Sequence, residues 1–341
     1  MRIISNTILI ASRVLGVVTL SVAAVACSSE AADTDATATS GSTSAESVER
    51  PQIVVTTNIL GDVVAAAVGT HADVEVIMPL GSDPHDFAPS ARQAESMENA
   101  DLLIINGAGF EEGMLDLIAN VSDTGTQIFS FADQIVLLEF SGDQEHSDDE
   151  HSDAEEEDHG HEDGDDPHIW TDPTRIAIAV EALEPVVSSL AGVDTAALSA
   201  SISDYVAELS ALDTSMNEAL FAVPDVQRVL ITNHEVFGYF ADRYNFRVVG
   251  AIIPSLTTNA EPSAADIDEL AKVIGAESIR AIFGETTQST QLAEALADEV
   301  DGDVAVVELF SESLGEDGSG AETYVGMMQL NADLIAKALT P

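Results

Sequence analysis

Positively charged residues are scarce in this sequence. It has 11 lysines and arginines, and only Lys272 and Lys337 are lysines, against 61 aspartates and glutamates, so the formal net charge is −50. Binding to nucleic acid phosphates requires a basic surface, and the deficit therefore excludes nucleic acid as a partner. Adaptation to a salty environment is the first explanation of this acidity, and attraction of cations is the second.

Cysteine and long apolar runs are also nearly absent. The single cysteine, Cys27, excludes an intramolecular disulfide. The apolar run at residues 14–26 follows Arg2 and Arg13 and ends in small residues. It is too short for a permanent membrane span. We therefore expect residues 1–26 to be an export signal.

Cys27 stands directly after that run, in VAAVACSS, which resembles a processing site of bacterial lipoproteins. The resemblance implies that Cys27 is the lipidated first residue of the mature protein, although Ala24 stands where such sites usually carry leucine. The alternative is an ordinary cleaved signal peptide. Residues 27–50 contain almost nothing apolar, so we expect a flexible tether. The predicted location is the cell envelope, either anchored by lipid to the outer face of the cytoplasmic membrane or periplasmic.

The rest of the chain alternates short β-branched runs with helical stretches, which predicts α/β lobes with largely parallel sheets. At 341 residues, 45% of them hydrophobic, the chain can form two domains with real cores. The seven runs expected to be strands are residues 52–57, 74–78, 102–106, 229–232, 248–252, 281–283 and 304–309.

Between these two groups of strands, residues 195–222 carry apolar side chains at close to helical period. Such a helix would be about 40 Å long, the span of a domain. It either joins two lobes or is a long core helix within one domain. The first interpretation gives an N-terminal lobe at residues 51–194, a linking helix at 195–222 and a C-terminal lobe at 223–341.

Three histidines in widely separated contexts are the strongest sign of chemistry. They are His85 in GSDPHDFAPS, His168 in DPHIWTDP and His234 in ITNHEVFGYF, and a carboxylate, Glu312, follows in LFSESLG. Three neutral imidazoles and one carboxylate fill a tetrahedral shell for zinc or its first-row neighbours. Roughly 65 to 85 residues separate successive members, so only a large preformed scaffold can bring them together.

The positions of these residues fit a site at the ends of strands. His85, His234 and Glu312 each follow a predicted strand, where ligands bind in parallel sheets. Histidines that bind metal usually donate their second nitrogen to a carboxylate or carbonyl. Asp83 and Asp86 are candidates for that role beside His85, and Glu235 and Glu285 are candidates elsewhere in the site.

Residues 142–167 form an acidic insertion with 14 carboxylates and no apolar residue larger than alanine. We expect it to be disordered without metal. Carboxylates interleaved with histidines can hold borderline cations loosely, at several alternative sites. The alternative is a solvated insertion in an already acidic protein. The four candidate residues for this weak auxiliary site are His146, His151, His159 and His161.

In order, the four contexts resemble the metal-site motifs of solute-binding protein family 9, the zinc- and manganese-binding receptors of bacterial ABC importers. The resemblance runs from about Gln52 to the C-terminus and includes AETYVGMMQLNADLIAKAL. It implies two Rossmann-like α/β lobes joined by a single long rigid helix, with the metal site between the lobes. It further implies that His85, His168 and His234 are ligands and that a membrane permease is the partner. We expect the receptor itself to be a monomer.

The resemblance also bears on the choice of metal. Histidine at position 234 implies zinc, whereas family members with glutamate there imply manganese. Imidazole favours the borderline metal in the same way. Glu312 departs from the family pattern, which has aspartate or no carboxylate here, so it either binds with shifted geometry or stops short of the metal. The acidic insertion resembles the histidine-rich loop of the family's zinc receptors. Manganese or iron remains the alternative cargo.

Two other classes of protein compete with a receptor that performs no covalent chemistry. A secreted zinc hydrolase would use three histidines and a water. No general base at motif spacing accompanies the histidines, and Glu312 would close the coordination. A surface protein for adhesion or metal buffering would need the acidic insertion but not the three ordered motifs.

Overall fold

The computed structural model describes residues 50–140, 164–277, 279–300 and 304–340. The expected export signal, Cys27, the expected tether and the four insertion histidines His146, His151, His159 and His161 lie outside these ranges. Residues 48–341 form one unit, and the fold below is that of its described residues. No helix in the described ranges is long and apolar enough to cross a membrane.

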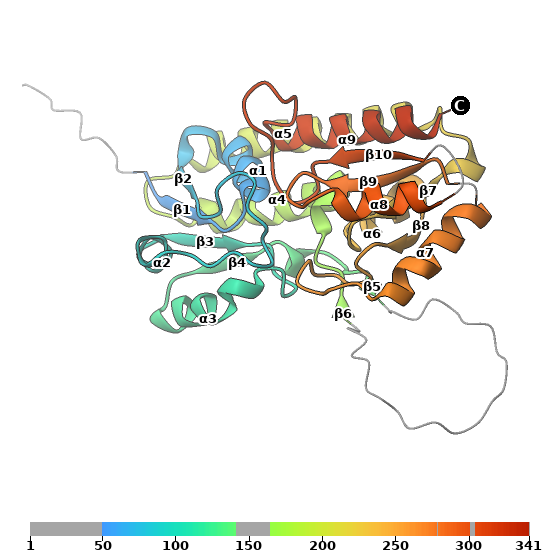
Figure 1. Ribbon diagram of the computed structural model, residues 1–341. Coiled ribbons are helices and arrows are strands. Elements are labelled where there is room, and N and C mark those ends of the chain that lie inside the picture. Colours follow the sequence, from blue (N-terminus) through green and yellow to red (C-terminus); the bar gives the residue numbers. More distant parts are fainter. Residues whose placement is uncertain (1–49, 141–163, 278, 301–303, 341) are drawn as a thin grey trace, which may run out of the picture. The chain divides into compact units, whose positions relative to one another are not determined.

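The first half of the chain builds a four-stranded parallel sheet with strand order β2-β1-β3-β4 (Figure 1). Its strands are β1 (Gln52–Val55), β2 (Asp73–Val76), β3 (Leu102–Ile105) and β4 (Ile128–Ser130). Polar caps start two of its helices: Thr57 accepts the N–H of Leu60, and Ser90 and Gln93 form a capping box. The helices are α1 (Asn58–Val68), α2 (Ala91–Glu98) and α3 (Leu115–Thr124), with short turns η1 (Gly69–His71), η2 (Glu112–Met114) and η3 (Ala132–Gln134).

The second half builds another four-stranded parallel sheet, with strand order β10-β9-β7-β8. Its strands are β7 (Val229–Thr232), β8 (Arg247–Ala251), β9 (Ala281–Glu285) and β10 (Ala305–Leu309). β7 and β9 are buried along their whole length, which explains why VLIT and AIFGE are largely apolar. The helices between these strands are α6 (Gly238–Tyr244), α7 (Ala264–Glu277) and α8 (Gln291–Glu299), and the turn η5 (Asp225–Gln227) precedes β7.

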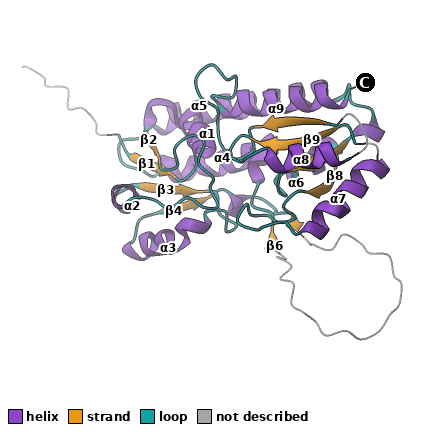
Figure 2. Cartoon of the chain, in the orientation of Figure 1, coloured by secondary structure: helices purple, strands orange, loops and turns teal. Residues whose placement is uncertain are grey.

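A layer of long helices adjoins both sheets (Figure 2). It consists of α4 (Pro173–Ser188), α5 (Thr195–Leu220) and α9 (Tyr324–Leu339), and α5 packs along α1, α4 and α9. One apolar cluster runs through this layer, from Ile53 and Val55 on β1 to Phe283 and Leu309 at the second sheet. Helix α5 ends two residues before the predicted position 222. Its buried side chains repeat at helical spacing, as the sequence pattern predicts.

The predicted fold class is confirmed: two parallel α/β sheets with a long helix between them in sequence. One strand was missed and one prediction about local structure is wrong. The strand β4 has no counterpart among the predicted strands, and residues 164–167, predicted to be disordered with the acidic insertion, are ordered. Strand β6 (Gly164–Asp165) pairs with β5 (Glu139–Phe140) as an antiparallel ribbon. Tyr239 holds this ribbon because its hydroxyl accepts the N–H of Leu138 and donates to the carbonyl of Asp166.

Candidate metal centre

The four residues predicted from separate motifs lie together in the fold. His85, His168, His234 and Glu312 each offer a donor atom, and all four atoms lie within 4.8 Å of one another. Their side chains are buried, with at most 2% of each residue exposed. Among the described residues this is the only group of three or more histidines or carboxylates with such spacing. The segments that carry them follow β2, β6, β7 and β10, so the ends of strands bring them together.

The distances between donor atoms suit a small tetrahedral cation. Oε1 of Glu312 lies 2.9 Å from Nε2 of His85, 3.4 Å from Nε2 of His234 and 3.9 Å from Nε2 of His168. The Nε2 atoms of His168 and His234 are 3.3 Å apart. A tetrahedron with metal–ligand bonds of about 2.0–2.1 Å has edges of about 3.3 Å. These separations of 2.9 to 3.9 Å are close to that edge, so the donor set suits a zinc-sized ion.

Each imidazole is oriented by a carboxylate on its other nitrogen. Nδ1 of His168 lies 2.8 Å from Oδ1 of Asp166, Nδ1 of His234 lies 2.6 Å from Oε1 of Glu285, and Nδ1 of His85 lies 2.9 Å from Oε1 of Glu112. A carboxylate accepts a hydrogen bond, so in each neutral imidazole Nδ1 carries the proton and Nε2 carries the lone pair. In that form three lone pairs face Glu312. Nε2 of His85 and both oxygens of Glu312 are buried without a well-aligned hydrogen bond, and each of these atoms can bind a cation.

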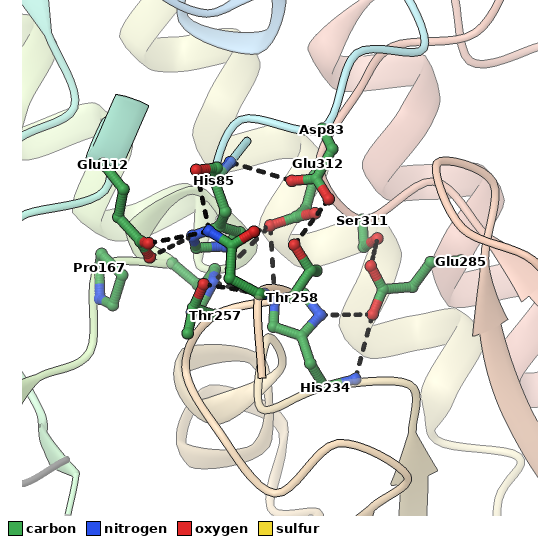
Figure 3. A network of polar contacts seen from close by, with 12 residues as sticks. Asp83, His85, Glu112, Pro167, His234, Thr257, Thr258, Glu285, Ser311 and Glu312 are labelled. Atoms are coloured by element: carbon green, nitrogen blue, oxygen red, sulfur yellow. Dashed lines mark hydrogen bonds and ion pairs between the residues drawn. The ribbon is translucent and has the colours of Figure 1, made fainter. Parts of the chain in front are cut away.

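Glu285, one of the two predicted supporting acids, holds His234 in two ways. Its Oε1 accepts the backbone N–H of His234 at 3.2 Å as well as the imidazole N–H, and its Oε2 accepts the hydroxyl of Ser311 at 2.9 Å (Figure 3). The other candidate, Glu235, makes no hydrogen bond to this imidazole. Burial raises the pKa of Glu235 to about 7.

The prediction that Asp83 or Asp86 orients the imidazole of His85 is wrong. Asp83 instead accepts the backbone N–H of His85 at 2.9 Å, and its other oxygen accepts hydrogen bonds from Thr258 and Gln288. The imidazole is held by Glu112, 27 residues further along the chain. Sequence reasoning missed Glu112 because nothing distinguishes it from the other 60 acids.

Electrostatics favours a cation at this centre. Burial alone lowers the pKa of His234, but Glu285 and Glu312 outweigh it and hold this pKa well above its ordinary value. Burial likewise raises the pKa of Glu312, but His234 and His85 outweigh it and lower the pKa overall. Glu312 therefore stays ionised, and a proton on His234 balances it when no metal is bound. A metal cation can replace that proton, and it forms bonds to all four donors where the proton joins only two of them.

Aromatic side chains enclose the centre on one side. The ring of Phe110 forms T-shaped contacts with His85 and His168, at centroid distances of 5.2 and 5.8 Å. Trp170 lies 5.4 Å from His168 and donates its indole N–H to the carbonyl of Ser311 at 2.7 Å. This wall keeps water away from the donors and strengthens their interaction with a cation.

Comparison with known proteins gives a consistent family. The sequence model of the family described as "Zinc-uptake complex component A periplasmic" (ZnuA) matches residues 53–338. The manganese-binding lipoprotein MntA of Halalkalibacterium halodurans is 27% identical over 295 residues, which cover 86% of this chain and 90% of that protein. The zinc-binding protein TroA of Treponema pallidum is 29% identical over 303 residues, which cover 88% of this chain and 92% of that protein.

Solved structures of similar fold point the same way. The periplasmic zinc-binding protein TroA of Treponema pallidum superposes with a TM-score of 0.72 at 29% identity, over 86% of this chain and 100% of that one. A crystal structure of ZnuA gives a TM-score of 0.68 at 24% identity, over 85% of this chain and 99% of that one. The latter likeness concerns the fold alone.

Proposed function

We propose, since the chain belongs to the family of the periplasmic zinc-uptake component ZnuA, that it is an extracytoplasmic receptor that captures one zinc ion and delivers it to the permease of an ABC importer. The observation that carries this proposal is the convergence of four buried donors, each imidazole held by its own carboxylate. A site so preformed binds a cation at little cost in ordering.

Zinc is favoured over manganese by the chemistry of the donors. Three imidazole nitrogens and one carboxylate suit a four-coordinate borderline metal, whereas manganese prefers six donors that are mostly oxygen. His85, His168, His234 and Glu312 are the proposed ligands. The relatives are named for both metals, so manganese, or iron, is the alternative cargo.

A receptor is also favoured over a zinc hydrolase. A catalytic zinc keeps one position open for water, and here the fourth donor is Glu312, which is 1% exposed. Glu285 and Asp166 are engaged with imidazoles, so neither is free to act as a general base. These contacts support a receptor that performs no covalent chemistry, and an adhesion role is not needed to explain the centre.

The remaining parts of the proposal rest on the sequence and the family. Residues 1–26 would direct export, Cys27 would carry a lipid anchor, and 27–50 would act as a tether. The two lobes would comprise residues 51–194 and 223–341, with the helix at 195–222 linking them. We propose a monomer that works outside the cytoplasmic membrane. The insertion histidines would supply weak auxiliary zinc sites.

One experiment tests the function directly. The full chain is stripped of metal, dialysed against equimolar zinc and manganese, and analysed for both elements. We expect one tightly held zinc per chain, with little manganese, and no hydrolysis of ester or peptide substrates. Retained manganese would establish the alternative cargo, and metal-dependent hydrolysis would establish an enzyme.

A further inference from the structure

The carboxylate that orients His85 differs from the other two in its exposure. The side chain of Glu112 is 37% exposed, whereas those of Asp166 and Glu285 are 6% and 1% exposed. The imidazole of His85 itself is only 1% exposed. One of the three proposed histidine ligands is therefore held from the surface, by a group that solvent can reach.

The second oxygen of Glu112 contacts the other half of the chain. Oε2 accepts a hydrogen bond from Nδ2 of Asn259 at 3.1 Å, and the same amide nitrogen lies 3.1 Å from the carbonyl oxygen of His85. Asn259 belongs to the segment between β8 and α7. A carboxylate has two acceptor oxygens, and Glu112 uses one for each partner (Figure 3 shows Glu112 beside His85).

The backbone around Glu112 allows and fixes its contact with His85. A Cβ atom on Gly113 would lie 2.3 Å from the carbonyl oxygen of Phe87, so only glycine lets η2 approach the His85 segment this closely. The preceding residue, Glu111, is buried, and its carboxylate accepts hydrogen bonds from Thr56 and from the N–H groups of Asn106 and Gly107. Glu111 thus fixes the loop from which Glu112 reaches outward.

Glu112 also stands at the opening of the centre. A small cavity of about 170 Å³ reaches His85 and is bordered by Glu112, Phe110, Asp165, Leu256 and Thr257. Residues of the segment with Asn259 therefore border the same opening as Glu112. The contact between Glu112 and Asn259 therefore lies beside this cavity.

We propose that Glu112 is a positioning residue that couples the orientation of His85 to the placement of Asn259 across the opening. While Asn259 is in place, Glu112 holds the imidazole with its lone pair on the metal. When the segment with Asn259 moves away, Glu112 loses its second partner and turns to solvent, and His85 loses its orientation. Metal release thus begins with the loss of the Glu112–Asn259 hydrogen bond. This inference rests on the proposed function.

The test measures zinc dissociation from the full chain by transfer to an excess of a chromogenic chelator. The variants are Glu112→Gln, Asn259→Ala and their combination, with Glu98→Gln as an exposed control on α2. Glutamine keeps the size of Glu112 but has one acceptor, so it satisfies only one partner. Loss of such a supporting partner typically costs 10–100-fold, and for an exposed group we expect about tenfold faster release. Asn259→Ala should accelerate release about fivefold.

The combined variant and the cobalt spectrum separate positioning from other roles. Because both residues act on His85, the double variant should release zinc faster than either single one but by less than the product of their effects. The visible spectrum of the Co²⁺-loaded protein should change in Glu112→Gln and not in Glu98→Gln. Effects that multiply, or unchanged release in Glu112→Gln, would overturn the inference.

Two further outcomes are distinguishable. If Glu112 only attracts cations to the opening, Glu112→Gln will slow zinc association in a salt-dependent manner and leave release unchanged, which also overturns the inference. If the unaltered chain holds no tight zinc, the proposed function itself fails and the inference falls with it.

Discussion

At the scale of single residues, the centre depends on three imidazoles whose free nitrogens face one carboxylate. A four-ligand zinc site is worth about 10 to 16 kcal/mol, or roughly 3 kcal/mol per ligand. Replacing His85, His168 or His234 by alanine should therefore weaken zinc binding about a hundredfold and leave the fold intact. Competition with a fluorescent chelator measures this loss. His71→Ala, outside the group, is the control, and unchanged affinity in two of the three variants would disprove the ligand set.

Protons compete with the metal at the same nitrogens. The pKa of His234 is raised, so this imidazole takes up a proton at a higher pH than a free histidine, and zinc must displace that proton. Zinc affinity should fall as the pH drops through this raised pKa, and much of the zinc should be released by about pH 6. Zinc titrations between pH 7.5 and 5 measure the effect. A flat profile would argue against histidine ligands.

A variant of Glu285 tests the competition between protons and zinc at His234 more directly. Glu285→Gln keeps an acceptor for the imidazole of His234 but removes a charge that raises its pKa. We expect about tenfold weaker zinc binding at neutral pH, because the imidazole becomes a poorer donor. The zinc affinity of the variant should also depend less on pH, because its imidazole takes up a proton only at lower pH and protons then compete less with zinc. The same titrations measure both quantities, and equal weakening at every pH would refute the electrostatic role.

At the scale of elements, the long helix α5 is tied to the second half of the chain by a buried acid. Asp213 on α5 accepts hydrogen bonds from Arg243 and from the hydroxyl of Tyr244 on α6. Asp213→Ala should lower the free energy of unfolding by about 1–3 kcal/mol, because it leaves these donors without their partner. Urea unfolding measures the change. Asp225→Ala, which removes a 91% exposed partner of Arg228, should change it by less than about 0.5 kcal/mol.

Helices and strands were predictable from the sequence where buried apolar side chains recur in a pattern typical of the element. Strands such as β7 and helix α5 are long enough for burial to leave a clear period. Strand β4 is three residues long and completes an edge of its sheet, so its run of apolar residues is too short to recognise. The β5–β6 ribbon has two residues per strand and depends on Tyr239, about 100 positions from Leu138. Contacts of that range leave no local pattern.

At the scale of the whole molecule, the position of the centre was predictable, but of the three carboxylates that hold its imidazoles only Glu285 was among the predicted candidates. His85, His234 and Glu312 follow strands, and the carboxyl ends of strands gather ligands in any parallel sheet. Recognition of strands therefore sufficed to place three of the four donors, whereas His168 follows β6, which was not among the predicted strands. The carboxylates behind the imidazoles had to be chosen among 61 acids, and chemistry alone does not distinguish them. Only the relative placement of η2 and the His85 segment identifies Glu112.

The acidic insertion can be separated from the centre by a deletion that the ribbon makes possible. Phe140 on β5 pairs with Gly164 on β6, so an Asn-Gly turn can replace residues 141–163 and leave Asp166 and His168 in place. Weak sites in a segment of this composition require ordering of the chain, which lowers their affinity. We expect the shortened protein to keep one tight zinc equivalent, to lose the weaker ones, and to capture zinc more slowly when it is scarce.

Calorimetry with zinc and stopped-flow capture by the metal-free protein measure these effects. A full-length variant with all four insertion histidines replaced by asparagine is the matched control, because it keeps the acids and the chain length. If it behaves like the shortened protein, the histidines hold the weak equivalents; if it behaves like the unaltered chain, the carboxylates do. Loss of the tight equivalent on shortening would mean that the insertion supplies a primary ligand. In that case Glu312 would not be the fourth donor.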